Sequence, residues 1–199
     1  MKRSLGYEIF MTALVLVVIA GVAGAVLGLV NHFTEVNAEE LLARKASAVY
    51  DGDLKKYVAP EGFDTDFRAE GGDVMGVYVP ANGNQDTFVF VAEGEGAYKG
   101  TLQILVNITK GKIVKIAKYD ANETPGLGGK ALEEGYFKQY YGRAITPDFE
   151  GFKLVKSAAS SSDEVRAISG ASKSSTAVTN AVNAAVKWYQ TRILRGAKK

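Results

Sequence analysis

The sequence predicts an α+β fold, with one N-terminal transmembrane helix followed by an antiparallel sheet flanked by helices. Three observations lead to this prediction. Residues 9–30 contain no charged side chain. Residues 74–119 contain runs of β-branched and aromatic residues that are separated by turn residues. From about residue 174 onward, apolar residues recur at the spacing of an amphipathic helix.

The apolar segment at residues 9–30 is long enough to cross a bilayer. Its only polar side chain is Thr12, and as a helix it would measure ~33 Å, against ~30 Å for the hydrocarbon core. Lys2 and Arg3 precede it, so the positive-inside bias places the N-terminus in the cytoplasm. Ala23-Gly24-Ala25 also resembles a signal-peptide cleavage site. A signal h-region spans only ~7–15 residues, however, which favours a retained, single-pass anchor in the cell membrane.

We therefore expect a cytoplasmic N-terminus (1–8), the transmembrane helix (9–30) and one extracytoplasmic domain (31–199). A helix is predicted over 38–49, with Asn37 as its N-cap. Strands are predicted at 74–79, 87–92, 101–109 and 113–119, with turns at 82–84 and 110–112. A helix over 131–141, a strand over 152–156, a loop over 157–162 and a long helix beginning near Ser174 complete the domain.

Composition excludes several kinds of site. The chain has no cysteine, which removes disulfides, iron–sulfur ligation, thiolate zinc sites and cysteine nucleophiles. Its one histidine, His32, lies beside the apolar segment, where it is badly placed for a catalytic triad. A metal site built from histidines needs more than one of them. The net charge is only +2 and the basic residues are dispersed, so nucleic acid is not expected as a partner.

A serine-rich segment precedes the predicted C-terminal helix. It reads Ser169-Gly170-Ala171-Ser172-Lys173-Ser174-Ser175. The N-terminus of a helix presents free N–H groups and the positive end of the helix dipole, which suit a phosphate. Gly170 lets the backbone turn sharply, and Lys173 adds a positive charge. The alternative is an ordinary N-cap, because serine is a preferred capping residue.

A glycine-rich loop is predicted between the strand at 113–119 and the helix at 131–141. It reads Glu123-Thr124-Pro125-Gly126-Leu127-Gly128-Gly129. Three glycines and a proline in seven residues indicate an unusual backbone path, along which amide groups can approach a flat ligand closely. The alternative is a tight connector. The loop is not a nucleotide-binding P-loop, because Gly129-Lys130 is followed by Ala131.

Taken in this order, the anchor, the Glu-Thr-Pro-Gly-Leu-Gly loop at 123–128 and the Ser-Gly-Ala-Ser motif at 169–172 resemble a known family. The chain is similar to the G subunit of the Rnf ion-translocating ferredoxin:NAD+ oxidoreductase complex. The related C subunit of the Na+-translocating NADH:quinone reductase shares the same FMN-binding domain. The resemblance implies an FMN joined through its phosphate to Ser172 by a flavin transferase that uses FAD. It also implies electron transfer between other subunits of the complex, coupled to Na+ or H+ movement.

On this resemblance we expect the flavin ring to lie against the loop at 123–128, with Leu127 on one face and Thr124 as a hydrogen-bonding side chain. Ser169, Lys173, Ser174 and Ser175 are expected to contact the phosphate. The full set of expected cofactor-binding residues is Ser169, Gly170, Ala171, Ser172, Lys173, Ser174 and Ser175, with Glu123, Thr124, Gly126, Leu127 and Gly128.

Two positions depart from the family pattern. Ser172 stands where threonine is usual, and Arg166 stands where the family has an aspartate three residues before the motif serine. Three alternatives stay open. These are a C-subunit-like component of a quinone reductase, a membrane-anchored binding or sensor module without cofactor, and a serine hydrolase that uses Ser169 or Ser172. For the last, His32 is badly placed as a general base, and Lys173 is a conceivable base, although adjacent residues rarely face each other on a helix.

Overall fold

The computed structural model describes residues 5–34, 42, 45–58 and 68–196, and the chain divides into two compact units, Met1–Leu41 and Leu42–Lys199. The part of the first unit that the structure describes is the helix α1 (Leu5–Thr34). Its residues Ile9–Asn31 have a mean hydropathy of 2.8, and none of the most apolar stretch is buried. By length and composition, α1 can cross a membrane. It includes the predicted helix and extends about one turn beyond it at each end.

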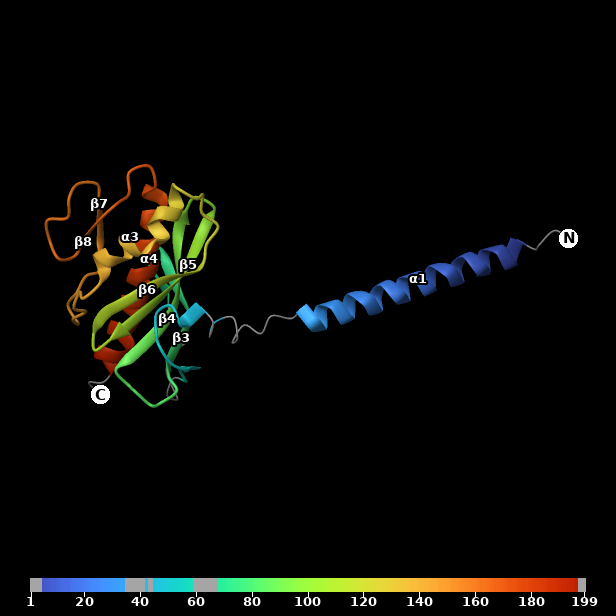
Figure 1. The fold of residues 1–199 in the computed structure, drawn as a ribbon, viewed down its shortest axis with the longest axis horizontal. Helices are drawn as coiled ribbons and strands as arrows, with labels where there is room; N and C mark the ends of the chain where they lie inside the picture. Colours follow the sequence, from blue (N-terminus) through green and yellow to red (C-terminus); the bar gives the residue numbers. More distant parts are fainter. Residues whose placement is uncertain (1–4, 35–41, 43–44, 59–67, 197–199) are drawn as a thin grey trace. The chain divides into compact units, whose positions relative to one another are not determined.

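The second unit is built on a six-stranded antiparallel sheet (Figure 1). The main strand order is β1-β3-β4-β5-β6, and β2 pairs with the start of β3. The strands are β1 (Leu54–Lys56), β2 (Arg68–Ala69), β3 (Gly72–Pro80), β4 (Thr87–Ala97), β5 (Gly100–Thr109) and β6 (Lys112–Asp120). The four predicted strands and their antiparallel order are confirmed, and each strand is longer than predicted.

One long helix, α4 (Ser172–Tyr189), covers one face of this sheet (Figure 1). Side chains on a strand alternate between the two faces. Phe88 and Phe90 of β4 accordingly belong to the core beneath α4. Val89 and Val91 belong to a second cluster on the other face, which contains Leu42 and Val49. The central strand β4 is therefore buried on both sides, which explains its nearly continuous apolar sequence.

Half of the predicted helix over 38–49 lies outside the described residues, as does its proposed N-cap Asn37. Of the residues described, Leu42, Lys45 and Ala46 are helical. Asn107 of β5 donates a side-chain hydrogen bond of 2.7 Å to the backbone oxygen of Val49. This bond holds the chain that precedes β1 against the sheet.

A glycine lets α4 approach the sheet very closely. A Cβ atom built on Gly94 of β4 would lie 1.8 Å from the backbone oxygen of Ala177, so no other residue fits without moving the helix. On the opposite side of α4, the hydroxyl of Tyr140 lies 2.9 Å from Oγ1 of Thr179. Because Thr179 donates its own proton to the Ser175 oxygen, Tyr140 is the donor of this bond. These contacts fix the N-terminal half of α4.

The predicted helix over 131–141 is wrong. The structure has three short pieces in its place: a 3₁₀-helix η1 (Gly128–Leu132), an α-helical turn α3 (Glu134–Phe137) and a second 3₁₀-helix η2 (Lys138–Tyr140). Glu133 interrupts them with an extended backbone, at φ −93° and ψ 151°. Gly135, a poor helix former, follows the break. The apolar side chains of this segment are nevertheless buried, which explains why their spacing suggested a helix.

The remaining elements differ from the prediction in detail. The expected strand over 152–156 is present as β7 (Lys153–Val155), and it pairs in parallel with an unpredicted strand, β8 (Glu164–Arg166). The segment 157–162 between them is a loop, as predicted. Helix α4 begins two residues before the predicted Ser174, and it ends in a π-helical turn, η3 (Gln190–Leu194).

Candidate functional site

A cavity of about 460 Å³ lies at the N-terminal end of α4. Its volume falls within the ~300–1,000 Å³ that is usual for small-molecule sites. The lining residues are Tyr98; Glu123, Thr124, Leu127 and Gly128; and Gly170, Ala171, Ser172, Lys173 and Ser174. All except Tyr98 belong to the two segments that the sequence singled out. The fold therefore brings the glycine-rich loop and the start of α4 together in the wall of one cavity.

Helix α4 begins without a side-chain cap. Its N-cap residue is Ala171, which makes no side-chain hydrogen bond, and its first turn carries no acidic residue. Alanine is a poor N-cap, so the alternative of an ordinary serine cap is wrong. The first N–H groups of a helix have no acceptor within the helix. The backbone N–H groups of Ser172 to Ser174 are thus available to an acceptor outside the helix. The positive end of the helix dipole favours an anion as this acceptor.

The side chains on this wall differ in accessibility. Ser172 and Lys173 are exposed, whereas Ser174 is buried. Gly170, which directly precedes the helix, has a positive φ of +80° that lets the chain turn into it. An exposed hydroxyl at Ser172 can be reached both by a ligand in the cavity and by a modifying enzyme, and Lys173 supplies a positive charge beside it.

Leu127 and Tyr98 supply the large apolar side chains of the cavity wall. Leu127 is 57% exposed and Tyr98 is 70% exposed, although both are large apolar side chains. The Thr124 oxygen accepts hydrogen bonds from the backbone nitrogens of Leu127 (3.3 Å) and Gly129 (3.0 Å), which fold the loop back on itself. Exposed aromatic and aliphatic surface at a cavity is suited to a flat apolar ligand.

A hydrogen bond joins the glycine-rich loop to the start of α4. The buried hydroxyl of Ser174 donates to Oε2 of Glu123 at 2.7 Å, and the backbone nitrogen of Tyr98 donates to Oε1 at 3.3 Å. Gly128 makes this arrangement possible, because a Cβ there would lie 2.1 Å from Glu123 Oε2 and 2.5 Å from Ser174 Oγ. The glycine at 128 is therefore required by the packing of a carboxylate and a hydroxyl behind it.

Three of the expected site residues do not line this cavity. Gly126 lies in the same loop without contributing to the wall. Ser169 lines a separate cavity of about 450 Å³, to which Lys130 and Arg166 also contribute. Ser175 is fully buried, and its Oγ accepts a hydrogen bond from the Ile168 nitrogen at 3.1 Å. The geometry thus gives Ser175 a structural role in holding the chain that leads into α4.

Tyr98 was not found from the sequence. It directly follows β4 in the tight β4–β5 hairpin and reaches the loop at 123–128, 25 residues away, only through the fold. Its position at the tip of a hairpin and its high exposure are the signals that mark it, and both require the structure.

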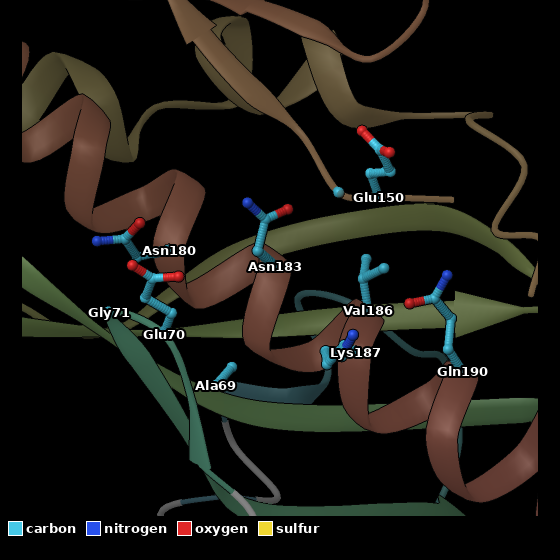
Figure 2. Close-up of a pocket in the computed structure, with 10 residues that line it drawn as sticks. Ala69, Glu70, Gly71, Glu150, Asn180, Asn183, Val186, Lys187 and Gln190 are labelled. Carbon is cyan, nitrogen blue, oxygen red and sulfur yellow. The ribbon is translucent and has the colours of Figure 1, made fainter. Parts of the chain in front are cut away.

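A larger cavity of about 660 Å³ lies along the C-terminal half of α4 and the start of η3 (Figure 2). Its lining includes two amide side chains, one from α4 and one from η3, that already hold the neighbouring loop. Asn183 exchanges two hydrogen bonds with the backbone of Phe152, at 2.7 and 2.9 Å. Gln190 donates to the backbone oxygens of Thr146 and Phe149. None of the residues that the sequence singled out lines it, and its engaged amides fit a structural role.

Comparison with known proteins places the first cavity within a recognised domain. Residues 97–187 match the model of the FMN-binding domain, and this range contains every expected site residue. The G subunit of the Na+-translocating ferredoxin:NAD+ oxidoreductase complex of Acetobacterium woodii is 31% identical over 200 residues, covering 92% of each chain. The G subunit of the proton-translocating complex of Clostridium ljungdahlii is 34% identical over 119 residues, covering 57% of this chain and 60% of that protein.

The fold has a relative among solved structures. The crystal structure of Shewanella oneidensis NqrC superposes with a TM-score of 0.50 over 76% of this chain and 91% of that one, at 15% sequence identity. At this identity the likeness concerns the fold alone. The 31% identity to the Acetobacterium woodii protein, which extends over 92% of both chains, shows the family. The chain belongs to the G subunits of ferredoxin:NAD+ oxidoreductase complexes.

Proposed function

We propose that this chain is the membrane-anchored electron-transfer subunit of an ion-translocating ferredoxin:NAD+ oxidoreductase complex, and that its FMN is joined through the phosphate to Oγ of Ser172. Family membership supports the complex and the FMN-binding domain. The observation that carries the assignment to Ser172 is one cavity, lined by the uncapped start of α4 and by the glycine-rich loop.

The two parts of the cavity wall fit the two ends of this cofactor. The free N–H groups of α4 and the Lys173 ammonium suit a phosphate. Leu127 and Tyr98 offer apolar surface to a ring system, and Thr124 offers a hydroxyl. Bound FMN would supply the capacity to accept and donate electrons, while the protein orients the ring. The chain itself would hold the phosphate, cover one face of the ring and limit access of water.

Covalent attachment has a clear chemical requirement. Esterification would form a bond between Ser172 Oγ and the phosphorus of the FMN half of FAD. It would break the P–O bond to the AMP half, so that AMP leaves and the serine proton passes to a base of the flavin transferase. Ser172 is exposed, as a substrate of another enzyme must be, whereas the neighbouring Ser174 and Ser175 are buried.

The intact mass of the full chain, co-expressed with a flavin transferase, tests this proposal. We expect an added mass of ~438 Da, equal to FMN minus water, and fluorescence that persists in a denaturing gel. Ser172→Ala should remove both, and Ser172→Thr should keep both. The matched control is Ser162→Ala, which deletes an exposed hydroxyl outside both the cavity and the 169–172 motif and should leave the added mass. A colourless, unmodified wild-type chain would favour a binding or sensor module without cofactor.

We further propose that α1 spans the cell membrane with its N-terminus in the cytoplasm, where Lys2 and Arg3 would hold it. The FMN-binding domain would then lie on the extracytoplasmic side, in contact with the other subunits of the complex. A C-terminal alkaline phosphatase fusion should be active, and a C-terminal green fluorescent protein fusion should be dark. The reverse pattern would refute this orientation.

A further inference from the structure

A carboxylate stands in the wall of the cavity that we propose for a phosphorylated flavin. Glu123 lines this cavity together with Ser172. Its two oxygens accept hydrogen bonds from Ser174 Oγ and from the Tyr98 nitrogen, which fix the position of the carboxylate. The absence of a side chain at Gly128 leaves space for it. Glu123 is therefore a fixed part of the cavity rather than a freely moving surface residue.

The carboxylate is close to the place where the phosphate would lie. Oε2 of Glu123 is 2.7 Å from Oγ of Ser174, and both residues line the same cavity of about 460 Å³ as Ser172. A phosphate on Ser172 would consequently lie within about one Debye length of Glu123 at ordinary ionic strength, ~10 Å, so salt does not fully screen their repulsion.

The positive groups of the cavity offset this repulsion only in part. Lys173 is exposed, so its charge is well screened by water. Glu123 is half-buried and held by two donors, so its field acts through a less polar medium. The cavity thus combines a helix start that attracts an anion with a fixed negative charge that repels one.

We infer that Glu123 weakens the binding of free phosphorylated flavins, so that the cavity retains FMN only through its bond to Ser172. This inference rests on the proposed function. A cavity that bound loose FMN tightly would be filled before attachment, and Ser172 would then be blocked from the transferase. Glu123 is in this sense a residue that determines specificity for the tethered over the free cofactor.

The test uses the full chain in detergent with Ser172→Ala, titrated separately with free FMN and with riboflavin and followed by flavin fluorescence. Riboflavin lacks the phosphate, so it reports on the ring site alone. Adding Glu123→Gln should lower the Kd for FMN about tenfold, equal to ~1.4 kcal/mol, and should change the Kd for riboflavin by less than about twofold. Glu123→Asp, which keeps the charge, should leave FMN binding weak. Glu70→Gln, on the wall of the larger cavity, makes the same change in net charge and should have no effect.

The outcomes separate this inference from the proposal on which it rests. Riboflavin binding in each variant shows that the cavity is intact. If Glu123→Gln leaves the FMN affinity unchanged, or strengthens riboflavin binding equally, the repulsion is refuted while the flavin site stands. If neither flavin binds to any variant, the repulsion is refuted, because removing the charge of Glu123 has not restored FMN binding; the mass added at Ser172 then decides the flavin site separately.

Discussion

Replacing Gly94 by alanine should destabilise the domain and disturb the cavity together. The new Cβ would lie 1.8 Å from the Ala177 oxygen, 2.8 Å from its carbonyl carbon and 2.9 Å from the Ala181 nitrogen. All three are backbone atoms of α4, so no side chain can rotate away and the helix itself must shift. Overpacking costs ~1–3 kcal/mol where side chains can adjust. We expect the upper end of this range, about 3 kcal/mol, because here only the backbone can move.

For a domain of this size, about 3 kcal/mol corresponds to a fall in Tm of roughly 6–12 °C. Thermal unfolding of the full chain in detergent, followed by circular dichroism, measures it. The matched control is Gly135→Ala in α3, where nothing lies within 4 Å of the added Cβ and φ is not positive. Alanine should be neutral or stabilising there, because it favours a helix by up to ~1 kcal/mol over glycine. Equal Tm values for Gly94→Ala and wild type, or an equal loss in both variants, would refute the close-packing argument.

Two further predictions concern single hydrogen bonds and pH. Ser174→Ala removes the donor to the Glu123 carboxylate and should lower the free energy of unfolding in urea by about 1.5–2 kcal/mol. This is the lower part of the range for hydrogen bonds to charged groups, because Glu123 is partly exposed. A loss below ~0.5 kcal/mol would show that water replaces this bond. Burial raises the pKa of Tyr141 from 10.0 to about 12, so the folded state favours its neutral form. The stability that this provides is complete below pH ~10 and is lost as the pH rises through ~12. Tyr141→Phe should make denaturation midpoints fall less steeply across this interval, and an unchanged slope would contradict the assignment.

The sequence predicted those elements whose burial follows a regular period. The strands β3 to β6 alternate or carry β-branched runs, and α4 repeats apolar residues at helical spacing, so local pattern and tertiary burial agree there. The strands β1, β2 and β8 have only two or three residues, which is too short for any period. The error at 131–141 has the opposite origin, because buried side chains along an irregular path imitated helical spacing.

In the candidate site, too, local features could be predicted from the sequence and long-range contacts could not. Loop composition and the serine-rich helix start were readable, since both are local properties of a few consecutive residues. Their meeting in one cavity depends on contacts that span the chain, such as the bond between Glu123 and Ser174, 51 residues apart. The N-cap residue of α4 could not be predicted from the sequence either. Three serines near the helix start suggested capping, while the backbone places Ala171 in that position.

The loop between β7 and β8 offers an attachment point for probes. Ala158 within it is exposed, and residues 157–162 contribute nothing to the wall of the flavin-sized cavity. Exposed loops of small residues tolerate modification well. Because the chain contains no cysteine, Ala158→Cys would create its sole thiol. A maleimide dye or nitroxide placed there would report the distance to a labelled neighbouring protein of the complex without any prior removal of native thiols.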